Sequence, residues 1–423
     1  MEALKTIGKA WKIPDIRKKI IFTLLMLVVF RIGSNIPVPG INREILDQAF
    51  NGDSGLFELF DLFSGGAFSN LTIFALSITP YITASIVLQL LTIAIPALER
   101  LAKEGVEGRK KIARYTRYLT VALAFVQAIG MTLGIFKQYL LNTDFFHITV
   151  VVFVLSAGTA FLMWLGELIN ENGIGNGIIF GGIVARVPSA VMAAYSNYKS
   201  GAISLVGIFL FLAFAILVII VIIEIQQGQR RIPVQYAKRV VGRKMYGGQS
   251  THIPLKVNQA GVIPVIFGMS LLQLPQTLVY FWPNTGFSEF MTKWLSTNGT
   301  PGVYFYSIFY AILIIFFTYF YTAVTFNPME VADNMKANGG FVPGIRPGRP
   351  TVEYLQKVMN RITFTGAIFL AVIAVMPLII GNFTAIDFKF GGTSLLIAVG
   401  VALDTMKQLE NQMVMRNYQG FLK

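Results

Sequence analysis

Long apolar runs recur from one end of the chain to the other, and they limit the possible folds more than any other feature. Hydrophobic residues make up 54% of the 423 residues and charged residues only 13%, against about 25% charged residues in ordinary soluble domains. A run of about 20 apolar residues crosses a bilayer as a helix, because a helix satisfies its own backbone hydrogen bonds there. The sequence therefore predicts an all-α, polytopic membrane protein.

Ten transmembrane helices are predicted, and they fall into two groups of five. The N-terminal half is expected over residues 1–201 and the C-terminal half over residues 202–423. With an odd number of helices in each half, the halves are inverted relative to each other, and inverted repeats place a pathway at their interface. The predicted helices cover residues 20–36, 71–95, 118–136, 149–169, 173–195, 203–225, 260–279, 303–324, 362–380 and 393–406.

Basic residues concentrate at the N-terminus and in three polar loops, at residues 100–117, 226–258 and 327–361. The first 12 residues alternate lysines with apolar residues, as an interfacial amphipathic helix does, and Pro14 is expected to end it. The middle loop has no acidic residue, and its alternating pattern predicts a protruding β-hairpin. The positive-inside rule places both termini and all three loops in the cytoplasm. This placement accounts for most of the net charge of +14, so a nucleic-acid ligand is not needed to explain it.

The second predicted span has an apolar ridge inside a polar frame. Ile82 and Ile86 are four residues apart, so they lie on one helix face. Two interpretations are open: polar and small residues that join helices, or the lining of a pathway. The polar frame consists of Thr79, Thr83, Ser85 and Gln89. The opposite face is expected to meet lipid and consists of Ala84, Val87, Leu88 and Leu91.

A short apolar segment, residues 56–63, precedes this span. It contains Glu58 and Asp61 and is far too short to cross a bilayer. It is expected to form either a small re-entrant helix within a cavity or an amphipathic helix on the surface.

The sequence offers little for catalysis or for metal binding. The chain has no cysteine, and its two histidines, His147 and His252, are far apart in sequence. Residues 173–177 are rich in glycine but follow no strand, so they are interpreted as a flexible helix start rather than a nucleotide-binding loop. No enzyme activity, cofactor or small-molecule substrate is expected.

An ion-coupled secondary transporter is the alternative function. Such proteins need ionisable groups at mid-membrane depth. Glu167, Glu224 and Asp404 all fall at predicted cytoplasmic helix ends, where hydration costs little, and Arg31 is the one mid-span charge found.

Six segments resemble the bacterial SecY family, whose members are central subunits of a protein-conducting channel. The resemblance covers essentially the whole chain, with the segments in order. One departure lies after Gly177, where the chain is about three residues shorter than the family pattern, close to one helical turn. The six segments are residues 78–86, 105–111, 173–177, 249–258, 341–348 and 391–397.

The resemblance implies an hourglass pore between two inverted halves. A ring of apolar side chains closes its waist, a short helix plugs its external funnel, and a lateral gate between spans two/three and seven/eight opens to lipid. The ring falls on Ile82, Ile86, Ile266 and Ile397, with Ile179 as the first span-five candidate. The plug, at about residues 55–66, falls on Leu56, Phe57, Leu59, Phe60, Phe63, Gly65 and Gly66. The gate and its polar strip fall on Thr83, Ser85 and Gln89.

The resemblance also implies partners and a location. A motor or ribosome would dock on the basic loops, at Arg239, Arg243, Lys244, Arg346 and Arg349. The implied partners are the SecE and SecG membrane subunits, the SecA motor ATPase, the ribosome, signal peptides, unfolded secretory polypeptides and anionic lipids, at the bacterial plasma membrane. An isoleucine ring suits this function, because it can close around any extended chain without hydrogen bonds and dewets when empty.

Overall fold

The computed structural model describes residues 8, 10–42, 66–68, 70–134, 136–175, 199, 205–236, 239–241, 244–246, 250–279, 285–295, 301–383 and 392–420. These residues are mainly helical, which confirms the all-α prediction. They belong to two compact units. The first unit comprises Met1–Leu205, Met269–Tyr306 and Leu378–Lys423, and the second comprises Val206–Gly268 and Ser307–Pro377. The division into two halves at residue 201 and their inverted arrangement both remain predictions.

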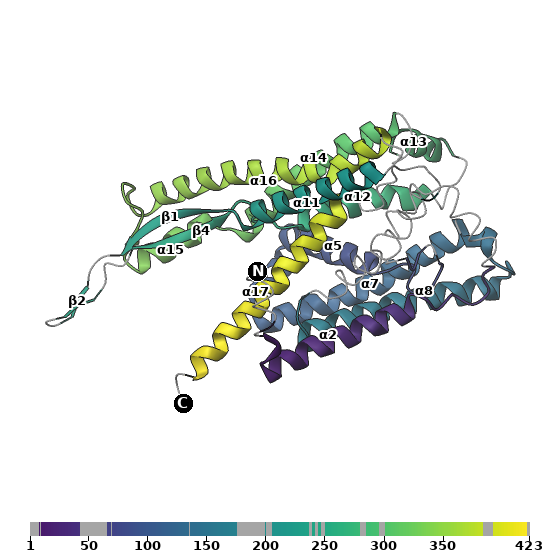
Figure 1. Cartoon of the computed structure of the whole chain (residues 1–423), viewed down its shortest axis with the longest axis horizontal. Helices are drawn as coiled ribbons and strands as arrows, with labels where there is room; N and C mark the ends of the chain where they lie inside the picture. The colour runs from purple at the N-terminus through teal and green to yellow at the C-terminus, as the bar shows by residue number, and fades with distance from the viewer. Residues whose placement is uncertain are drawn as a thin grey trace. The chain divides into compact units, whose positions relative to one another are not determined.

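The first unit contains the N-terminal helices. α8 packs along α7 and also contacts α2, and α5 packs along α7 (Figure 1). The helices are α2 (Pro14–Gly33), α5 (Thr79–Ala94), α6 (Pro96–Lys103), α7 (Val106–Gly134), the 3-10 helix η1 (Phe136–Tyr139) and α8 (Phe145–Asn172).

The later helices include several of the predicted spans. They are α11 (Leu205–Gln227), α12 (Ile263–Val279), α13 (Gly286–Trp294), α14 (Gly302–Thr325), α15 (Pro328–Ala337), α16 (Arg349–Phe383) and α17 (Gly392–Gly420). Within the described ranges, four helical stretches are long and apolar enough to cross a membrane, and α5 with α6 forms a fifth candidate that bends by 102°. The four are Val106–Gly134, Phe145–Asn172, Gly302–Ala337 and Arg349–Ile380. The full number of ten spans remains a prediction.

A small β-sheet confirms the hairpin predicted in the middle loop. β1 (Gln229–Tyr236) pairs antiparallel with β4 (Ser250–Lys256), with Ile232 opposite Ile253. A third strand, β5 (Gly340–Phe341), extends the sheet in the order β4-β1-β5. β2 (Arg239–Val241) and β3 (Lys244–Tyr246) form a separate pair beyond it (Figure 1).

Several predicted boundaries are wrong, and most of them err in the same direction. Polar residues that were assigned to loops lie on helices, because a helix can continue past the apolar part of its sequence. The basic residues 109–117 lie on α7, α16 begins at Arg349, and α17 continues well beyond residue 406. Pro14 begins α2, where its missing N–H leaves no bond unmade.

Candidate functional site

The chain enters α5 through buried backbone that is not helical. Residues 71–78 were predicted as helix, but Leu71 and Ser77 have φ values of 44° and 53°. The N–H of Val38 donates to the carbonyl of Leu71, and the N–H of Ile73 donates to the carbonyl of Ile36, both at 3.0 Å. Irregular backbone inside a membrane protein requires partners of this kind. The apolar sequence of residues 71–78 therefore predicted correctly that the segment is buried, but the prediction that it is helical is wrong.

Aromatic rings and two glycines hold this segment in place. The ring of Phe74 stacks between Phe30 and Phe161, with centroid distances of 6.0 and 5.9 Å. A side chain at Gly33 would meet the ring of Phe74, and one at Gly158 would meet the carbonyl oxygen of Ile73. α2 and α8 can therefore approach the segment only because both positions are glycine.

α5 has protein on more sides than the sequence predicted. Ala84 is 0% exposed and Leu88 is 8% exposed, although both were assigned to the lipid face. That assignment is wrong because α5 packs along α7, and a small residue such as Ala84 permits close packing. On the polar side, the hydroxyl of Thr83 donates to the carbonyl of Thr79 at 3.0 Å. Thr83 is buried, whereas Ser85 and Gln89 are half-buried.

The four described ring candidates are apolar side chains in buried or half-buried positions. Ile86 and Ile397 are buried in the first unit, and Ile266 is buried in the second. Ile82 is half-buried and packs against a cluster that includes Phe30, Phe74 and Leu162. Ile179 lies outside the described residues. The assignment of these residues to one ring remains a prediction.

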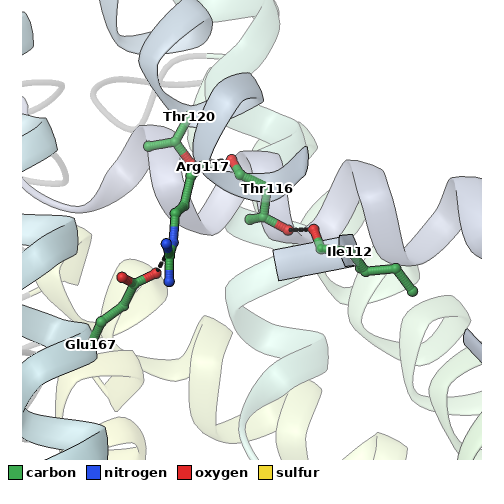
Figure 2. A network of polar contacts seen from close by, with 5 residues as sticks. All are labelled: Ile112, Thr116, Arg117, Thr120 and Glu167. Carbon is green, nitrogen blue, oxygen red and sulfur yellow. Dashed lines mark hydrogen bonds and ion pairs between the residues drawn. The ribbon is translucent and has the colours of Figure 1, made fainter. Parts of the chain in front are cut away.

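An ion pair joins α7 to α8 beside α5. The Nε of Arg117 donates to Oε1 of Glu167 at 2.7 Å (Figure 2). Sequence reasoning missed this pair, because it placed Arg117 in a loop and Glu167 at a hydrated helix end. No local signal in the sequence pairs them, because Arg117 ends a run of basic residues and Glu167 lies 50 positions away.

The glycine-rich residues after α8 form a packed turn. The N–H of Ile174 donates to Oγ1 of Thr23 on α2, and the N–H of Gly175 donates to Oε1 of Gln408 on α17, both at 3.0 Å. Gly175 has φ +76°, and a side chain there would meet Thr405. For the described part of the motif, residues 173–175, the expectation of a flexible helix start is therefore wrong.

The sheet, α15 and the start of α16 share a hydrophobic core in the second unit. Ile232 and Val234 of β1 point into it, together with Met335 of α15 and Leu355 of α16. Figure 1 shows β1 and β4 extending with α15 beside them. The basic residues of the two polar loops are therefore attached to a folded sheet and two helices.

Arg346 lies on a turn between two glycines. Its side chain is exposed, and its carbonyl accepts a hydrogen bond from the hydroxyl of Thr351 at 2.9 Å. Gly344 and Gly348 on either side have φ values of +82° and +101°, which favour glycine. Arg349 is also exposed, and its Nε lies 3.8 Å from Oε1 of Glu353.

The structure describes some of the remaining predicted site residues but not others. Arg239 and Lys244 belong to the β2–β3 pair, whereas Arg243 lies outside the described residues. The plug residues 56–65 also lie outside them, and Gly66 follows with φ +92°. Within the described ranges, no group of three His, Cys, Asp or Glu side chains could hold a metal ion.

Comparisons with known proteins agree with one another. A family model described as SecY matches residues 72–406. The chain is 49% identical to "Protein translocase subunit SecY" of Streptomyces coelicolor, over 99% of this chain and 100% of the relative. It is 47% identical to the subunit of the same name from Aquifex aeolicus, over 98% of each chain.

Solved structures share the fold. "The structure of a protein conducting channel" superposes with a TM-score of 0.68 at 20% identity, over 96% of this chain and 97% of that one. "Sec61 in the Canine ribosome-channel complex from the endoplasmic reticulum" superposes with a TM-score of 0.65 at 19% identity, over the same shares.

Proposed function

Because the chain belongs to the SecY family of protein translocase subunits, we propose that it forms the conduit through which secretory polypeptides cross the membrane and from which membrane proteins enter the lipid. The observation that carries this function is the match to translocase subunits along nearly the whole chain. It favours a multi-pass channel subunit over an ion-coupled secondary transporter. We further propose that the chain performs no catalysis and that partners supply the driving force.

The test of this function is a translocation assay. The purified chain is reconstituted in vesicles with SecE, SecG and the SecA motor, and a secretory precursor is tested for protection from protease. Protection that requires ATP and a signal sequence is the expected result. Absence of protection with every partner, combined with uptake of a small solute along an ion gradient, would instead establish the transporter.

In this proposal, Ile82, Ile86, Ile266 and Ile397 close the pore, with Ile179 as their span-five neighbour. Support comes from their apolar, branched side chains and from the burial of the described members other than Ile82, which is half-buried. An apolar constriction resists ions by dewetting and forms no specific bond with a passing chain.

Replacement of Ile82, Ile86, Ile266 and Ile397 by glycine is expected to raise the resting ion conductance of reconstituted channels severalfold, because the dewetted constriction is lost. Planar-bilayer recording measures this directly. Replacing the exposed α8 residue Phe153 by glycine is the matched control. An unchanged conductance in the fourfold variant would remove the ring from the proposal.

The exposed basic residues are proposed as the docking surface for SecA or the ribosome. Arg346 has the strongest support, because its carbonyl is hydrogen-bonded within the turn and its exposed side chain can form bidentate contacts with an acidic partner. Arg349, Arg239, Arg243 and Lys244 would extend this surface.

Arg346→Glu is expected to abolish most motor-driven translocation while the chain still inserts into the membrane. The same charge reversal at the exposed Lys336 of α15 is the control. Vesicle translocation and SecA co-sedimentation measure the effect. Normal SecA binding by the Arg346 variant would contradict the docking role.

The gate, the plug and the location complete the proposal. Thr83, Ser85 and Gln89 would form the polar strip that signal peptides meet on their way to lipid, and residues 55–66 would form the plug. The chain would lie in the bacterial plasma membrane with both termini and the basic loops in the cytoplasm, where anionic lipids attract them. SecE and SecG would be its membrane partners.

A further inference from the structure

The ion pair between Arg117 and Glu167 differs from the other ion pairs of the described residues. Those join side chains three or four positions apart in sequence. This pair alone, among pairs with both partners described, links two helices, α7 and α8 (Figure 2). Its carboxylate is also better protected from solvent, because the Glu167 side chain is only 25% exposed.

Both charges lie within helices that can cross a membrane. Arg117 is the last of the basic residues on the first part of α7, and its side chain is 48% exposed. The carboxylate of Glu167 is only partly exposed, so the charge-assisted hydrogen bond of 2.7 Å between the two side chains favours one placement of the helices. If α7 slid past α8 by one helical turn, about 5.4 Å, the pair would break. The pair therefore specifies one register between the two helices.

The same pair lies next to α5. α5 packs along α7 and also contacts α8, and Tyr81, near its start, is close enough to both Arg117 and Glu167 to experience their fields. Tyr81 immediately precedes Ile82. The ion pair is thus located at the level where α5 begins and where the first ring candidate lies.

The hydroxyls of Thr116 and Thr120, next to Arg117 on α7, are hydrogen-bonded within that helix. Thr116 donates to the carbonyl of Ile112 at 3.0 Å, and Thr120 donates to the carbonyl of Thr116 at 2.7 Å (Figure 2). Both hydroxyls therefore donate their hydrogen bonds within α7. Among the described residues, Arg117 and Glu167 make a side-chain hydrogen bond that joins α7 to α8, in addition to the apolar packing of the two helices.

We propose that the Arg117–Glu167 ion pair is a positioning element that fixes the register of α7 against α8 and thereby holds the start of α5, with Ile82 and Ile86, at the level where the pore closes. The effect on the pore rests on the proposed function of Ile82 and Ile86 as ring residues. The register of α7 against α8 is independent of that function, and separate measurements of position and conductance distinguish the two.

The experiment measures position and function in the same variants. The chain has no cysteine, so Ile93→Cys on α5 and Phe153→Cys on α8, both exposed positions, accept spin labels at two defined sites. The distance between the labels is measured by pulsed EPR in vesicles, and resting ion conductance is measured in planar bilayers. The variants are Arg117→Ala, Glu167→Ala and the exchange R117E/E167R. Arg114→Ala, which removes an exposed charge from the same helix, is the control.

Each single variant is expected to shift the label distance by at least one residue's rise, about 1.5 Å, and to raise conductance severalfold. The exchange and the control are expected to keep the parent distance and conductance. If a single variant does not reach the membrane, R117A/E167A replaces it, because that variant leaves neither charge without its partner, and the same shift is expected.

An unchanged label distance overturns the positioning role whatever the conductance. A shifted distance with parent conductance supports the positioning role and instead counts against Ile82 and Ile86 as pore-closing residues. Failure of the exchange to restore the distance also contradicts the proposal, since a register set by charge attraction must tolerate the reversed pair.

Discussion

At the residue scale, Gly175 shows how the absence of a side chain joins distant parts of the sequence. Its N–H bonds to Gln408 of α17, while the preceding N–H bonds to Thr23 of α2. Its φ of +76° costs any other residue about 1–2 kcal/mol. A side chain would also meet Thr405. The glycine is therefore required twice, by backbone conformation and by packing.

Gly175→Ala is expected to lower the stability of the folded chain by on the order of 2–5 kcal/mol, the sum of backbone strain and overpacking. Thermal unfolding in nanodiscs measures the loss. Addition of Thr405→Ala should recover the packing part and leave the backbone part. Gly286→Ala, where a side chain would have open space, is the control. Equal stability of the Gly175 and Gly286 variants would contradict this account.

Sequence reasoning found the glycine motif but misread its purpose. Composition shows that residues 173–177 are rich in glycine, and flexibility is the usual consequence. The close approach of Thr23 and Thr405 involves residues about 150 and 230 positions away. No local pattern encodes such contacts. The Arg117–Glu167 pair was missed for the same reason, since its partners lie 50 positions apart.

At the element scale, α5 illustrates what hydropathy predicts and what it leaves open. The pattern placed an apolar segment over residues 71–95, and the structure buries most of it. Helix begins only at Thr79, because residues 71–78 exchange backbone hydrogen bonds with residues 36–38 instead. Hydropathy reports burial, whereas conformation depends on where the backbone finds its partners. The β1–β4 hairpin was predictable because its alternation and turns are local.

Gly158→Ala tests the packing of this non-helical segment. A side chain there would meet the carbonyl of Ile73, so α8 and the segment must move apart. We expect a loss of about 1–3 kcal/mol in stability and faster hydrogen exchange at the N–H of Ile73, which bonds to Ile36. The control is Ala157→Leu, which adds bulk at the neighbouring exposed position. Faster exchange in the control alone would refute the close approach.

At the scale of the whole molecule, the distribution of basic residues predicts the orientation of the chain in the membrane, which the packing of the helices does not. The described basic residues gather on α6, on the first half of α7, and around the sheet and the start of α16, whereas α13 and the start of α8 carry few. The positive-inside rule predicts that the first group faces the cytoplasm and the second faces the outside. Residue identity alone allowed this prediction, since membrane orientation depends on charge in the loops rather than on tertiary contacts.

Single cysteines test that orientation in the cysteine-free chain. Lys336→Cys on α15 is expected to react with a membrane-impermeant maleimide only from the cytoplasmic side. Glu289→Cys on α13 and Asp144→Cys at the start of α8 should react only from the outside, because an odd number of predicted spans separates each from the basic loops. The parent chain, with no thiol, gives the background. Labelling of Lys336→Cys and Glu289→Cys from the same side would require a different number of spans between them, and the ten-span topology would have to be redrawn.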